Sequence, residues 1–416
     1  MSDHRLDERD VGDAPIDKRR RFTVLVVLAI AELLAMTLWF SASAVGPELA
    51  DAWNLSSGQT AWLTNAVQLG FVIGAVLSAT FTLSDIIAPR YLFAGSAALG
   101  AGATFVLALG VDSFWPAVIL RLITGIALAG VYPPGMKIMA GWFRSGRGLA
   151  IGVLVGALTV GSAMPHLIRA VGGIGEPTLV LLAAAGLALV GGLLVLTIEP
   201  GPYQAPTAPF DPRAVSRILR DRGTTLANLG YFGHMWELYA VWAWIPVFLT
   251  ESFIRSGHSE TLAALVAFGT IAIGGVGAVV AGIAADAIGR TTVTSVSLVL
   301  SGVACLTAGF VFGASPFVVV PFVLGWGFVI VADSAQFSTA VSELADDTYV
   351  GTALTLQTAI GFLLTLGSIQ ITPLIADVVG WQWAFAPLVV GPVVGTAAML
   401  WLRRLPEARR LAGGRR

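Results

Sequence analysis

The chain alternates long apolar runs with short polar stretches, and this pattern predicts membrane-spanning helices. A bilayer core requires about 20 consecutive apolar residues per helix, and more when the helix tilts. The runs are too long and too uniformly apolar for barrel strands, which alternate over about 9 to 11 residues. Twelve runs are expected, at 22–45, 59–83, 91–111, 114–143, 148–170, 177–198, 224–250, 260–285, 291–313, 316–344, 350–376 and 382–403.

The predicted fold class is therefore all-α, a polytopic membrane protein whose backbone polar groups are satisfied within helices. The composition agrees, because 56% of the 416 residues are hydrophobic and only 12% are charged, against about 25% charged in a soluble protein. Too few polar side chains remain to cover a water-facing surface. No connecting segment is long enough for a soluble catalytic domain, so an enzyme is not expected.

Basic residues indicate which helix ends face the cytoplasm, because Lys and Arg accumulate there. If both termini are cytoplasmic, 20 of the 24 basic residues lie on that side, two lie within the fourth run, and only Arg169 and Arg255 lie outside. Four consecutive basic residues, 18–21, directly precede the first run, which lacks a small-residue cleavage site and is expected to remain as a helix. These features predict a multi-pass protein of the cytoplasmic (inner) membrane, in contact with lipid.

The longest internal connection divides the chain six runs plus six. It contains five Pro followed by a basic stretch in which Arg213, Arg217 and Arg220 share one side at helical spacing. This suits either an interfacial helix or a solvated linker. The predicted units are an amino-terminal cytoplasmic tail at 1–21, a six-helix bundle at 22–198, a cytoplasmic linker at 199–223, a second six-helix bundle at 224–403 and a basic cytoplasmic tail at 404–416.

Two motifs in the chain resemble signatures of the major facilitator superfamily. Gly282-x-x-x-Asp286-x-x-Gly289-Arg290 matches the family's turn motif, and Arg121-Leu-Ile-Thr-Gly125 matches a second motif in the fourth run. The resemblance covers essentially the whole chain. It implies two six-helix bundles with a central cavity and alternating access.

The resemblance also implies a conformational latch at the cytoplasmic turns. Its candidate residues are Asp85 and Arg90 in the first half and Asp286, Gly289 and Arg290 in the second. Asp286 is expected near the amino end of a helix in the opposite bundle, where the helix dipole favours an anion.

Ionisable residues inside the apolar runs are candidates for function, because a charge in hydrocarbon costs several kcal/mol unless it faces protein or water. Glu32, Arg121, Lys137, Glu237 and Asp333 occupy runs one, four, seven and ten, which the resemblance implies line the cavity. Glu32, Glu237 and Asp333 are the predicted proton-coupling residues, because burial favours a neutral carboxyl group that can exchange a proton as access alternates. The alternatives are structural ion pairs and, for Asp333, an internal helix cap.

The remaining candidates contact substrate, and they are Arg121, Trp39, Gln68, Trp244 and Gln357. The planar guanidinium suits an anion or a partner among the buried carboxylates, and the indoles suit an apolar or cation-binding wall that the amides complement. Trp39 follows Glu32 by seven residues, as Trp244 follows Glu237, which predicts one helical face for each pair. His166 and His234 are either proton relays or neutral core histidines.

The predicted function is proton-coupled uptake of a small anion or zwitterion by alternating access, in a secondary transporter that works as a monomer. The alternative within transport is proton-antiport efflux of an amphipathic compound, which the incomplete antiporter motif around Pro165 disfavours. A non-transporting membrane sensor is the alternative from another class. Four scattered His and the single Cys305 give no metal set, and the chain lacks the glycine-rich phosphate-binding motif of ATP-driven proteins. No cofactor, metal or nucleic-acid partner is expected.

Overall fold

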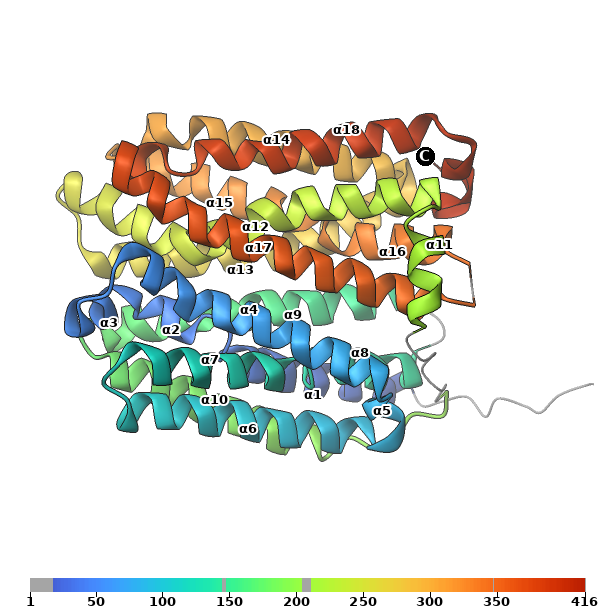
Figure 1. The fold of residues 1–416 in the computed structure, drawn as a ribbon, viewed down its shortest axis with the longest axis horizontal. Coiled ribbons are helices and arrows are strands. Elements are labelled where there is room, and N and C mark those ends of the chain that lie inside the picture. Colours follow the sequence, from blue (N-terminus) through green and yellow to red (C-terminus); the bar gives the residue numbers. More distant parts are fainter. Residues whose placement is uncertain (1–17, 144–146, 204–210, 347, 416) are drawn as a thin grey trace, which may run out of the picture.

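The computed structural model describes residues 18–143, 147–203, 211–346 and 348–415, and over these residues the chain forms two helical bundles side by side (Figure 1). The described residues contain helices and no strands, which confirms the all-α fold class. Most of the predicted tail at 1–21 lies outside the described residues, as does part of the linker.

Over its described residues, the first bundle contains six helical spans, two of them interrupted. In chain order its helices are α1 (Lys18–Met36) with α2 (Ser41–Ala44), then α3 (Gly46–Trp53), α4 (Ser57–Thr80), α5 (Leu83–Ile86), α6 (Pro89–Gly110), α7 (Phe114–Leu128) with α8 (Tyr132–Trp142), α9 (Arg147–Ile168) with the π-helical turn η1 (Arg169–Gly173), and α10 (Pro177–Val195).

The second bundle repeats this plan after a short connection formed by η2 (Pro212–Ala214) and α11 (Val215–Ile218). Its helices are α12 (Arg222–Arg255), α13 (Glu260–Ile288), α14 (Arg290–Val311), α15 (Pro316–Ala332) with α16 (Ser334–Leu344), α17 (Val350–Val379), the turns η3 (Trp381–Trp383) and η4 (Ala386–Val389), α18 (Val390–Arg404) and η5 (Pro406–Gly414).

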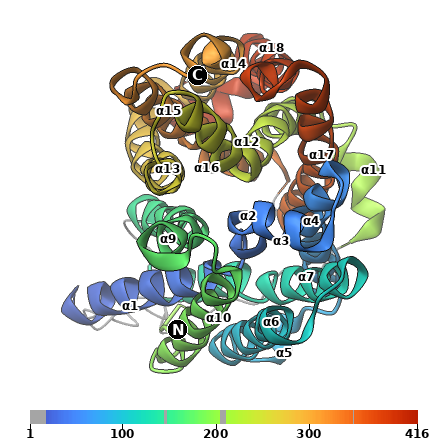
Figure 2. The same cartoon turned by 90° about the vertical axis from the view of Figure 1, so that its left-hand side faces the viewer.

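Ten helical spans of the described chain are long and apolar enough to cross a membrane. The other two are α1, which begins with four basic residues, and α12, which mixes polar side chains such as His234 and Glu237 with its apolar ones. Both are packed among the other spans, α1 against α9 and α10, and α12 against α17 and α18 (Figure 2). The twelve predicted runs therefore correspond to twelve packed spans.

Three spans break near their middle, which the apolar pattern does not predict. The breaks separate α1 from α2, α7 from α8, and α15 from α16. Pro133 and Pro134 begin α8 and explain the second break, because proline cannot donate to the helical ladder. Each break leaves backbone carbonyls without intrahelical donors, so polar side chains are needed nearby.

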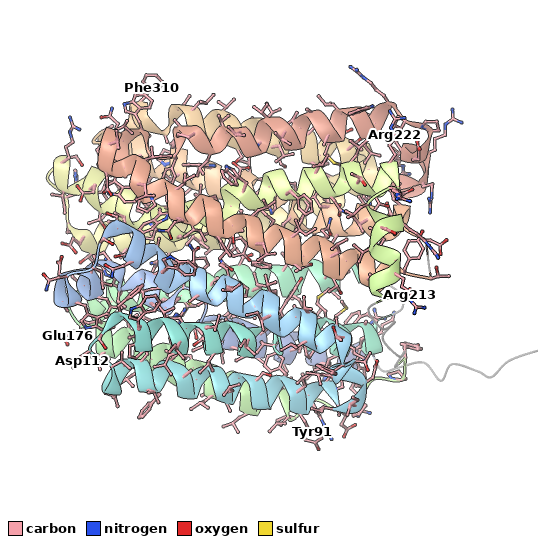
Figure 3. All side chains as sticks on the ribbon, viewed as in Figure 1. Tyr91, Asp112, Glu176, Arg213, Arg222 and Phe310 are labelled. Atoms are coloured by element: carbon pink, nitrogen blue, oxygen red, sulfur yellow. The ribbon has the colours of Figure 1, made fainter. Side chains whose placement is uncertain are left out.

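The two ends of the bundles differ in charge. Arg213 and Arg222 lie at the end that carries α11, here called the linker end, and Asp112 and Glu176 lie at the opposite end, here called the α3 end (Figure 3). Arg20 pairs with Glu199, and the chain near Arg415 contacts α13 at the linker end. Both ends of the described chain therefore lie at the linker end.

The bundles meet along two helix pairs, α9 with α13 and α4 with α17. Gly156 and Gly275 face each other in the first pair, and a Cβ atom at Gly275 would lie 3.0 Å from the Cα atom of Gly156. Such an approach of two backbones favours a residue without a side chain at position 275, whereas a Cβ atom at Gly156 would lie no closer than 3.8 Å to the α13 backbone.

We predict that Gly275→Val destabilises the contact between the bundles. The added methyl groups would overlap the α9 backbone, and overpacking of this kind costs about 1–3 kcal/mol. The thermal unfolding temperature of the purified protein in detergent should therefore fall. Gly325→Val on α15 is the control, because no heavy atom lies within 4 Å of its Cβ position. Equal unfolding temperatures for the two variants would contradict the close α9–α13 contact.

Candidate functional site

Aromatic side chains from both bundles meet at the interface between them. Trp39 from the α1–α2 break and Phe71 from α4 contact Tyr239 from α12 and Phe362 from α17, and these four residues are here called the central aromatic cluster. The ring centroids lie 5.0 Å apart for Trp39 and Phe71, 5.6 Å for Trp39 and Phe362, and 5.0 Å for Tyr239 and Phe362. All four are buried. Trp39 therefore contacts both bundles, as a residue between them should.

Buried polar atoms without partners lie on the helices that carry this cluster. Gln68 precedes Phe71 by three residues, and neither of its amide atoms has a hydrogen-bond partner among the described residues. Trp39 Nε1 and Gln357 Nε2 also lack partners there, while Gln357 Oε1 accepts a hydrogen bond of 3.2 Å from Ser338. Unpaired buried polar atoms are costly. Each of these atoms is therefore a buried hydrogen-bonding group that no described residue satisfies.

Trp244 lies apart from the central aromatic cluster. It follows Tyr239 by five residues, which turns it by about 140° around α12. Its Nε1 donates to the Ile369 carbonyl at 2.9 Å, and its ring lies 5.5 Å from that of Trp381. Trp381 in turn lines a cavity of about 450 Å³ at the α3 end, together with Glu251, Arg255, Phe312, Val379, Gly380 and Gln382. The structure does not bring Trp244 together with Trp39.

Glu32 is fully buried in the first bundle and faces the α7–α8 break. A Cβ atom at Gly135 on α8 would lie 3.3 Å from its Oε2 atom. Neither carboxyl oxygen has a hydrogen-bond partner among the described residues. A carboxyl group in this position is stable only when neutral or when a ligand supplies a donor.

Glu237 is buried in the second bundle on the side of α12 that faces α14. Its Oε2 atom accepts hydrogen bonds from Ser301 Oγ at 2.7 Å and from Cys305 Sγ at 3.5 Å. Trp326 Nε1 donates to Ser301 Oγ at 3.0 Å and extends the network to α15. Glu237 and Trp244 lie seven residues apart in the continuous helix α12, as the prediction of one helical face requires, but Glu237 contacts α14 and Trp244 contacts α17.

The corresponding pair in the first bundle does not share a continuous helix. Glu32 lies on α1, whereas Trp39 lies in the turn after α1 has ended. The helical spacing that predicts a shared face holds only for a continuous helix. The break at residues 37–40 therefore places Trp39 between the bundles and leaves Glu32 inside its own bundle.

Asp333 lies at the α15–α16 break and faces His234 on α12. The Oδ1 atom of Asp333 and the Nδ1 atom of His234 are 2.9 Å apart, and the two residues are 1% and 0% exposed. Asp333 occupies the N-cap position of α16, but its side chain makes no capping hydrogen bond. The alternative role of internal cap is therefore not the one observed.

Arg121 holds the α1–α2 break together. Its guanidinium donates to the Leu38 carbonyl at 3.0 Å, the Trp39 carbonyl at 2.7 Å, Ser41 Oγ at 3.1 Å and, through Nε, the Leu63 carbonyl at 3.4 Å. The expected pairing with a buried carboxylate is wrong, because backbone carbonyls freed by the break take its place. Arg121 is completely buried.

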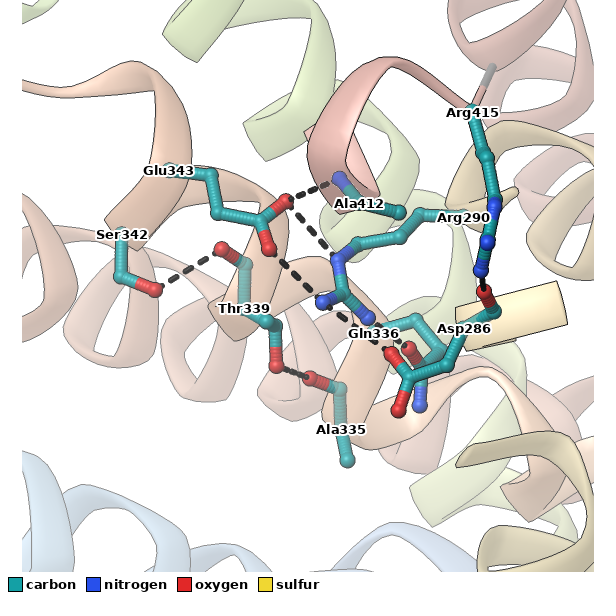
Figure 4. A network of polar contacts seen from close by, with 9 residues as sticks. All are labelled: Asp286, Arg290, Ala335, Gln336, Thr339, Ser342, Glu343, Ala412 and Arg415. Atoms are coloured by element: carbon teal, nitrogen blue, oxygen red, sulfur yellow. Dashed lines mark hydrogen bonds and ion pairs between the residues drawn. The ribbon is translucent and has the colours of Figure 1, made fainter. Parts of the chain in front are cut away.

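The predicted latch residues of the second half form a charged network at the linker end (Figure 4). Arg290 donates to both carboxylate oxygens of Glu343, at 2.7 and 2.8 Å, and to Gln336 Oε1 at 2.8 Å. Asp286 lies 3.5 Å from Arg290. Gly289 between them has a φ of +96°, a left-handed conformation that favours glycine.

The carboxy-terminal turn η5 binds to this network. The backbone N–H of Ala412 donates to Glu343 Oε2 at 3.0 Å, and Leu411 is completely buried. Arg415 contacts the Asp286 carbonyl. The sequence predicts a basic tail here but does not reveal this docking. The Asp286 side chain is 70% exposed, and its described partners belong to its own bundle, so its contact with the opposite bundle stays a prediction.

The first-half latch residues have different partners. Asp85 pairs with Lys137 of α8, and Arg90 donates to the Ile198 carbonyl at 3.1 Å and to Tyr91 at 3.1 Å. The structure therefore brings Asp286 and Arg290 together but assigns Asp85 and Arg90 to separate contacts.

Polar contacts join the bundles at the α3 end. Asn65 on α4 donates to the Leu366 carbonyl at 3.2 Å and to Gln370 at 3.1 Å, and Gln370 donates back to the Gly58 carbonyl at 3.1 Å. Ser57 donates to Asp377 at 3.0 Å, and Arg169 in η1, bound to Glu48, also reaches Glu260 of α13 at 3.3 Å. The bundles are closed against each other at this end.

Comparisons with known proteins agree with this architecture. A sequence model of the Major Facilitator Superfamily matches residues 28–256. The chain is 28% identical over 178 residues to the MFS-type transporter pytF of Aspergillus terreus, a match that covers 41% of this chain and 56% of the relative. The chain thus matches little more than half the length of this curated relative.

Solved transporter structures share the fold across almost the whole chain. A mutant of the nucleoside transporter NupG has a TM-score of 0.72 at 16% identity, covering 91% of this chain and 99% of its own. The D-xylose–proton symporter has a TM-score of 0.72 at 18% identity, covering 94% and 99%. A bacterial homologue of the human lysosomal transporter Spinster, in an inward-facing and occupied conformation, has a TM-score of 0.69 at 17% identity, covering 94% and 98%.

Arg121→Lys is predicted to destabilise the protein even though it keeps the charge. The ammonium group of a lysine cannot donate at once to the Leu38 and Trp39 carbonyls and to the Ser41 hydroxyl, all of which the Arg121 guanidinium reaches. Hydrogen bonds to charged groups contribute about 1.5–3 kcal/mol each, so we expect a lower unfolding temperature for Arg121→Lys and a lower folded yield for Arg121→Ala. A normal unfolding temperature with impaired solute binding would instead assign the guanidinium to the substrate.

Glu343→Gln is predicted to loosen the docked turn η5. The substitution removes the charge that holds Arg290 and weakens the acceptor for the Ala412 amide. A loss of about 1–2 kcal/mol corresponds to a factor of about 5–30 in the opening equilibrium, which hydrogen exchange of residues 405–415 measures. Asp286→Asn, whose contact with Arg290 is longer, is the control and should have a smaller effect. Equal exchange in both variants would contradict the docking role of Glu343.

Proposed function

Since this chain belongs to the major facilitator superfamily, we propose that it is a secondary transporter that takes up a small solute together with protons by alternating access. The central aromatic cluster and the unpaired polar atoms beside it are the proposed solute site. The single observation that carries this proposal is that the indole of Trp39, whose buried N–H has no partner among the described residues, packs against Phe71 of the first bundle and Phe362 of the second. A site shared by both bundles changes when the bundles move against each other.

The chemistry around this site favours a neutral or zwitterionic solute with an apolar face. The rings of the central aromatic cluster supply apolar contact area, and Gln68, Gln357 and the Trp39 indole supply hydrogen bonds. The sequence-based argument for an anion depended on Arg121, whose donors are occupied by backbone carbonyls. Trp244 is not part of the proposed site.

Proton coupling is proposed for Glu32, with Glu237 and Asp333 as further sites in the second bundle. Glu32 has the strongest support, because its buried carboxyl group lacks any hydrogen-bond partner among the described residues. Such a group remains neutral while water is excluded and can release its proton when one side opens.

The linker end is proposed to face the cytoplasm, in a cytoplasmic (inner) membrane, with the protein acting as a monomer surrounded by lipid. The charged turns at this end support the orientation. The closed α3 end then corresponds to an outer gate. In the state open to the outside, Asp286 is proposed to contact the opposite bundle and serve as the latch.

Efflux of an amphipathic compound in exchange for protons is the second candidate, and the aromatic character of the interface is the observation that favours it. The two directions differ in sign. Uptake with protons makes the outside of a vesicle more alkaline when solute is added there, whereas antiport produces the opposite change.

A binding screen on the purified protein tests the proposed function. Uridine, D-xylose, neutral amino acids and amphipathic weak bases form the first panel, and a compound that binds the folded protein raises its unfolding temperature. Each compound that binds is then tested for uptake into proteoliposomes with and without a pH gradient. A compound that binds without crossing the membrane would support the sensor alternative.

Glu32→Gln is predicted to abolish accumulation driven by a pH gradient while preserving exchange of solute across the membrane. The amide mimics the protonated carboxyl group but cannot release a proton. With a gradient of about one pH unit, each coupled proton contributes a factor of about ten to accumulation. Glu176→Gln, an exposed carboxylate at the α3 end, is the control. Full gradient-driven accumulation by the Glu32 variant would overturn the assignment.

The orientation is predicted to be testable with single cysteines, because Cys305 is buried. Ser216 on α11 and Asp112 at the α3 end are exposed positions at opposite ends. In intact cells, a membrane-impermeant maleimide should label Asp112→Cys but not Ser216→Cys until the cells are opened. The reverse order of labelling would invert the proposed topology.

A further inference from the structure

A groove on the outer side of the second bundle has no part in the proposed transport mechanism. It lies between α14 and α18, encloses about 390 Å³, and is lined by apolar residues apart from Thr396. Figure 2 shows these two helices together on the side of the second bundle that faces away from the first. The groove therefore opens towards the membrane and not towards the interface between the bundles.

The walls of the groove are exposed, and its floor is buried. Val299 and Val303 of α14 are 49% and 52% exposed, and Val393 of α18 is 60% exposed. Leu298, which lies in the floor, is completely buried. Aliphatic walls lose dispersion contacts unless a group of matching character fills the space between them. A linear hydrocarbon chain has the shape and the character that this groove requires.

The linker end of the groove carries two arginines. Arg404 follows Val393 on α18 by eleven residues, which is close to three full turns, so it continues the line of the groove. Thr292 precedes Val299 on α14 by seven residues and accepts a hydrogen bond from Arg403. Arg403 and Arg404 are both exposed. An apolar groove and a basic surface therefore lie in one line along these helices.

Trp401 indicates the level of the membrane surface beside the two arginines. Its side chain is 54% exposed, and the Cζ atom of Arg222 lies 5.2 Å from the centroid of its ring. Trp side chains are enriched where the hydrocarbon layer meets the lipid headgroups. Arg222 lies at the linker end (Figure 3). Since Arg403 and Arg404 follow Trp401 towards the end of α18, they lie at the level of the headgroups.

We propose that the groove between α14 and α18 binds one anionic phospholipid from the leaflet at the linker end. One acyl chain lies in the apolar groove. The phosphate group contacts Arg403 and Arg404, because planar guanidinium groups match phosphate oxygens in charge and geometry. The bound lipid then connects α14 and α18 on the outer side of the bundle.

The length of the groove determines the conformation of the bound chain. Leu306, at the far end, lies about 21 Å along α14 from Thr292. One leaflet contributes about 15 Å to the hydrocarbon core. A chain that fills the groove from the linker end is therefore extended and reaches past the middle of the membrane. This proposal requires neither a solute nor proton coupling, so its failure would leave the proposed function unaffected.

The test titrates the purified full chain in detergent with dioleoylphosphatidylglycerol or dioleoylphosphatidylcholine and measures bound lipid by native mass spectrometry. The two lipids share their acyl chains and differ in headgroup charge, and the wild-type protein should bind the anionic lipid more tightly. Arg403→Gln combined with Arg404→Gln should weaken that binding about 25-fold, a factor of about five for each charge. Arg213→Gln combined with Arg217→Gln removes two exposed charges from α11 at the same end and is the control.

A second variant tests the acyl chain separately. Ala397→Trp places an indole in the groove and should weaken the binding of both lipids. Ala98→Trp, at an exposed position on α6, is its control. All the substituted positions are exposed, so the variants should fold.

Several outcomes would overturn the proposal. Equal wild-type affinities for the two lipids would exclude recognition of the anionic headgroup, and equal losses for the two arginine pairs would reduce it to general charge attraction. Lipid binding that Ala397→Trp leaves unchanged would place the acyl chain elsewhere. A mass of two protein chains that Ala397→Trp abolishes would identify the groove as a contact between copies of this chain.

Discussion

The need to satisfy every polar group inside a hydrocarbon environment determines where this protein places its few charged side chains. An intact helix satisfies its own backbone, but a broken helix exposes carbonyls that water cannot reach. Arg121 stabilises the α1–α2 break, because its guanidinium donates hydrogen bonds to two backbone carbonyls and a hydroxyl there. Glu32 faces the α7–α8 break, and Asp333 stands within the α15–α16 break. Arg121, Glu32 and Asp333 therefore lie at helix interruptions, whereas Glu237 lies in the continuous helix α12 and is satisfied by side chains of α14.

The two bundles repeat the same plan but use their acidic residues differently. Glu32 and Glu237 occupy corresponding helices, yet Glu237 is hydrogen-bonded to Ser301 and Cys305 whereas Glu32 has no described partner. The second bundle adds a histidine beside its other carboxyl group. The two bundles thus provide similar helical frameworks. The neighbouring side chains determine that the Glu237 carboxyl group is hydrogen-bonded and that the Glu32 carboxyl group is not.

Properties that depend on one stretch of sequence were predictable. The apolar runs indicated the spans and the fold class, and the turn motif indicated a glycine at position 289, which the structure places at positive φ. Properties that depend on distant segments were not. The partners of Arg121 arise from a helix break, the position of Trp244 follows from its rotation around α12, and the docking of η5 joins residues 343 and 412. The apolar pattern contains no information on such contacts.

The paired glycines at the α9–α13 contact have a mechanical consequence. Helices that interlock through side chains must separate before they can rotate, because each side chain sits in a hollow of its neighbour. Gly156 and Gly275 place one backbone close to the other at this contact between the bundles. At this contact no side chain has to leave a hollow in the neighbouring helix. The two bundles can therefore rotate against each other here while α9 and α13 stay in contact. The groups that oppose this rotation lie elsewhere between the bundles. They are the polar contacts at the α3 end and the rings of the central aromatic cluster.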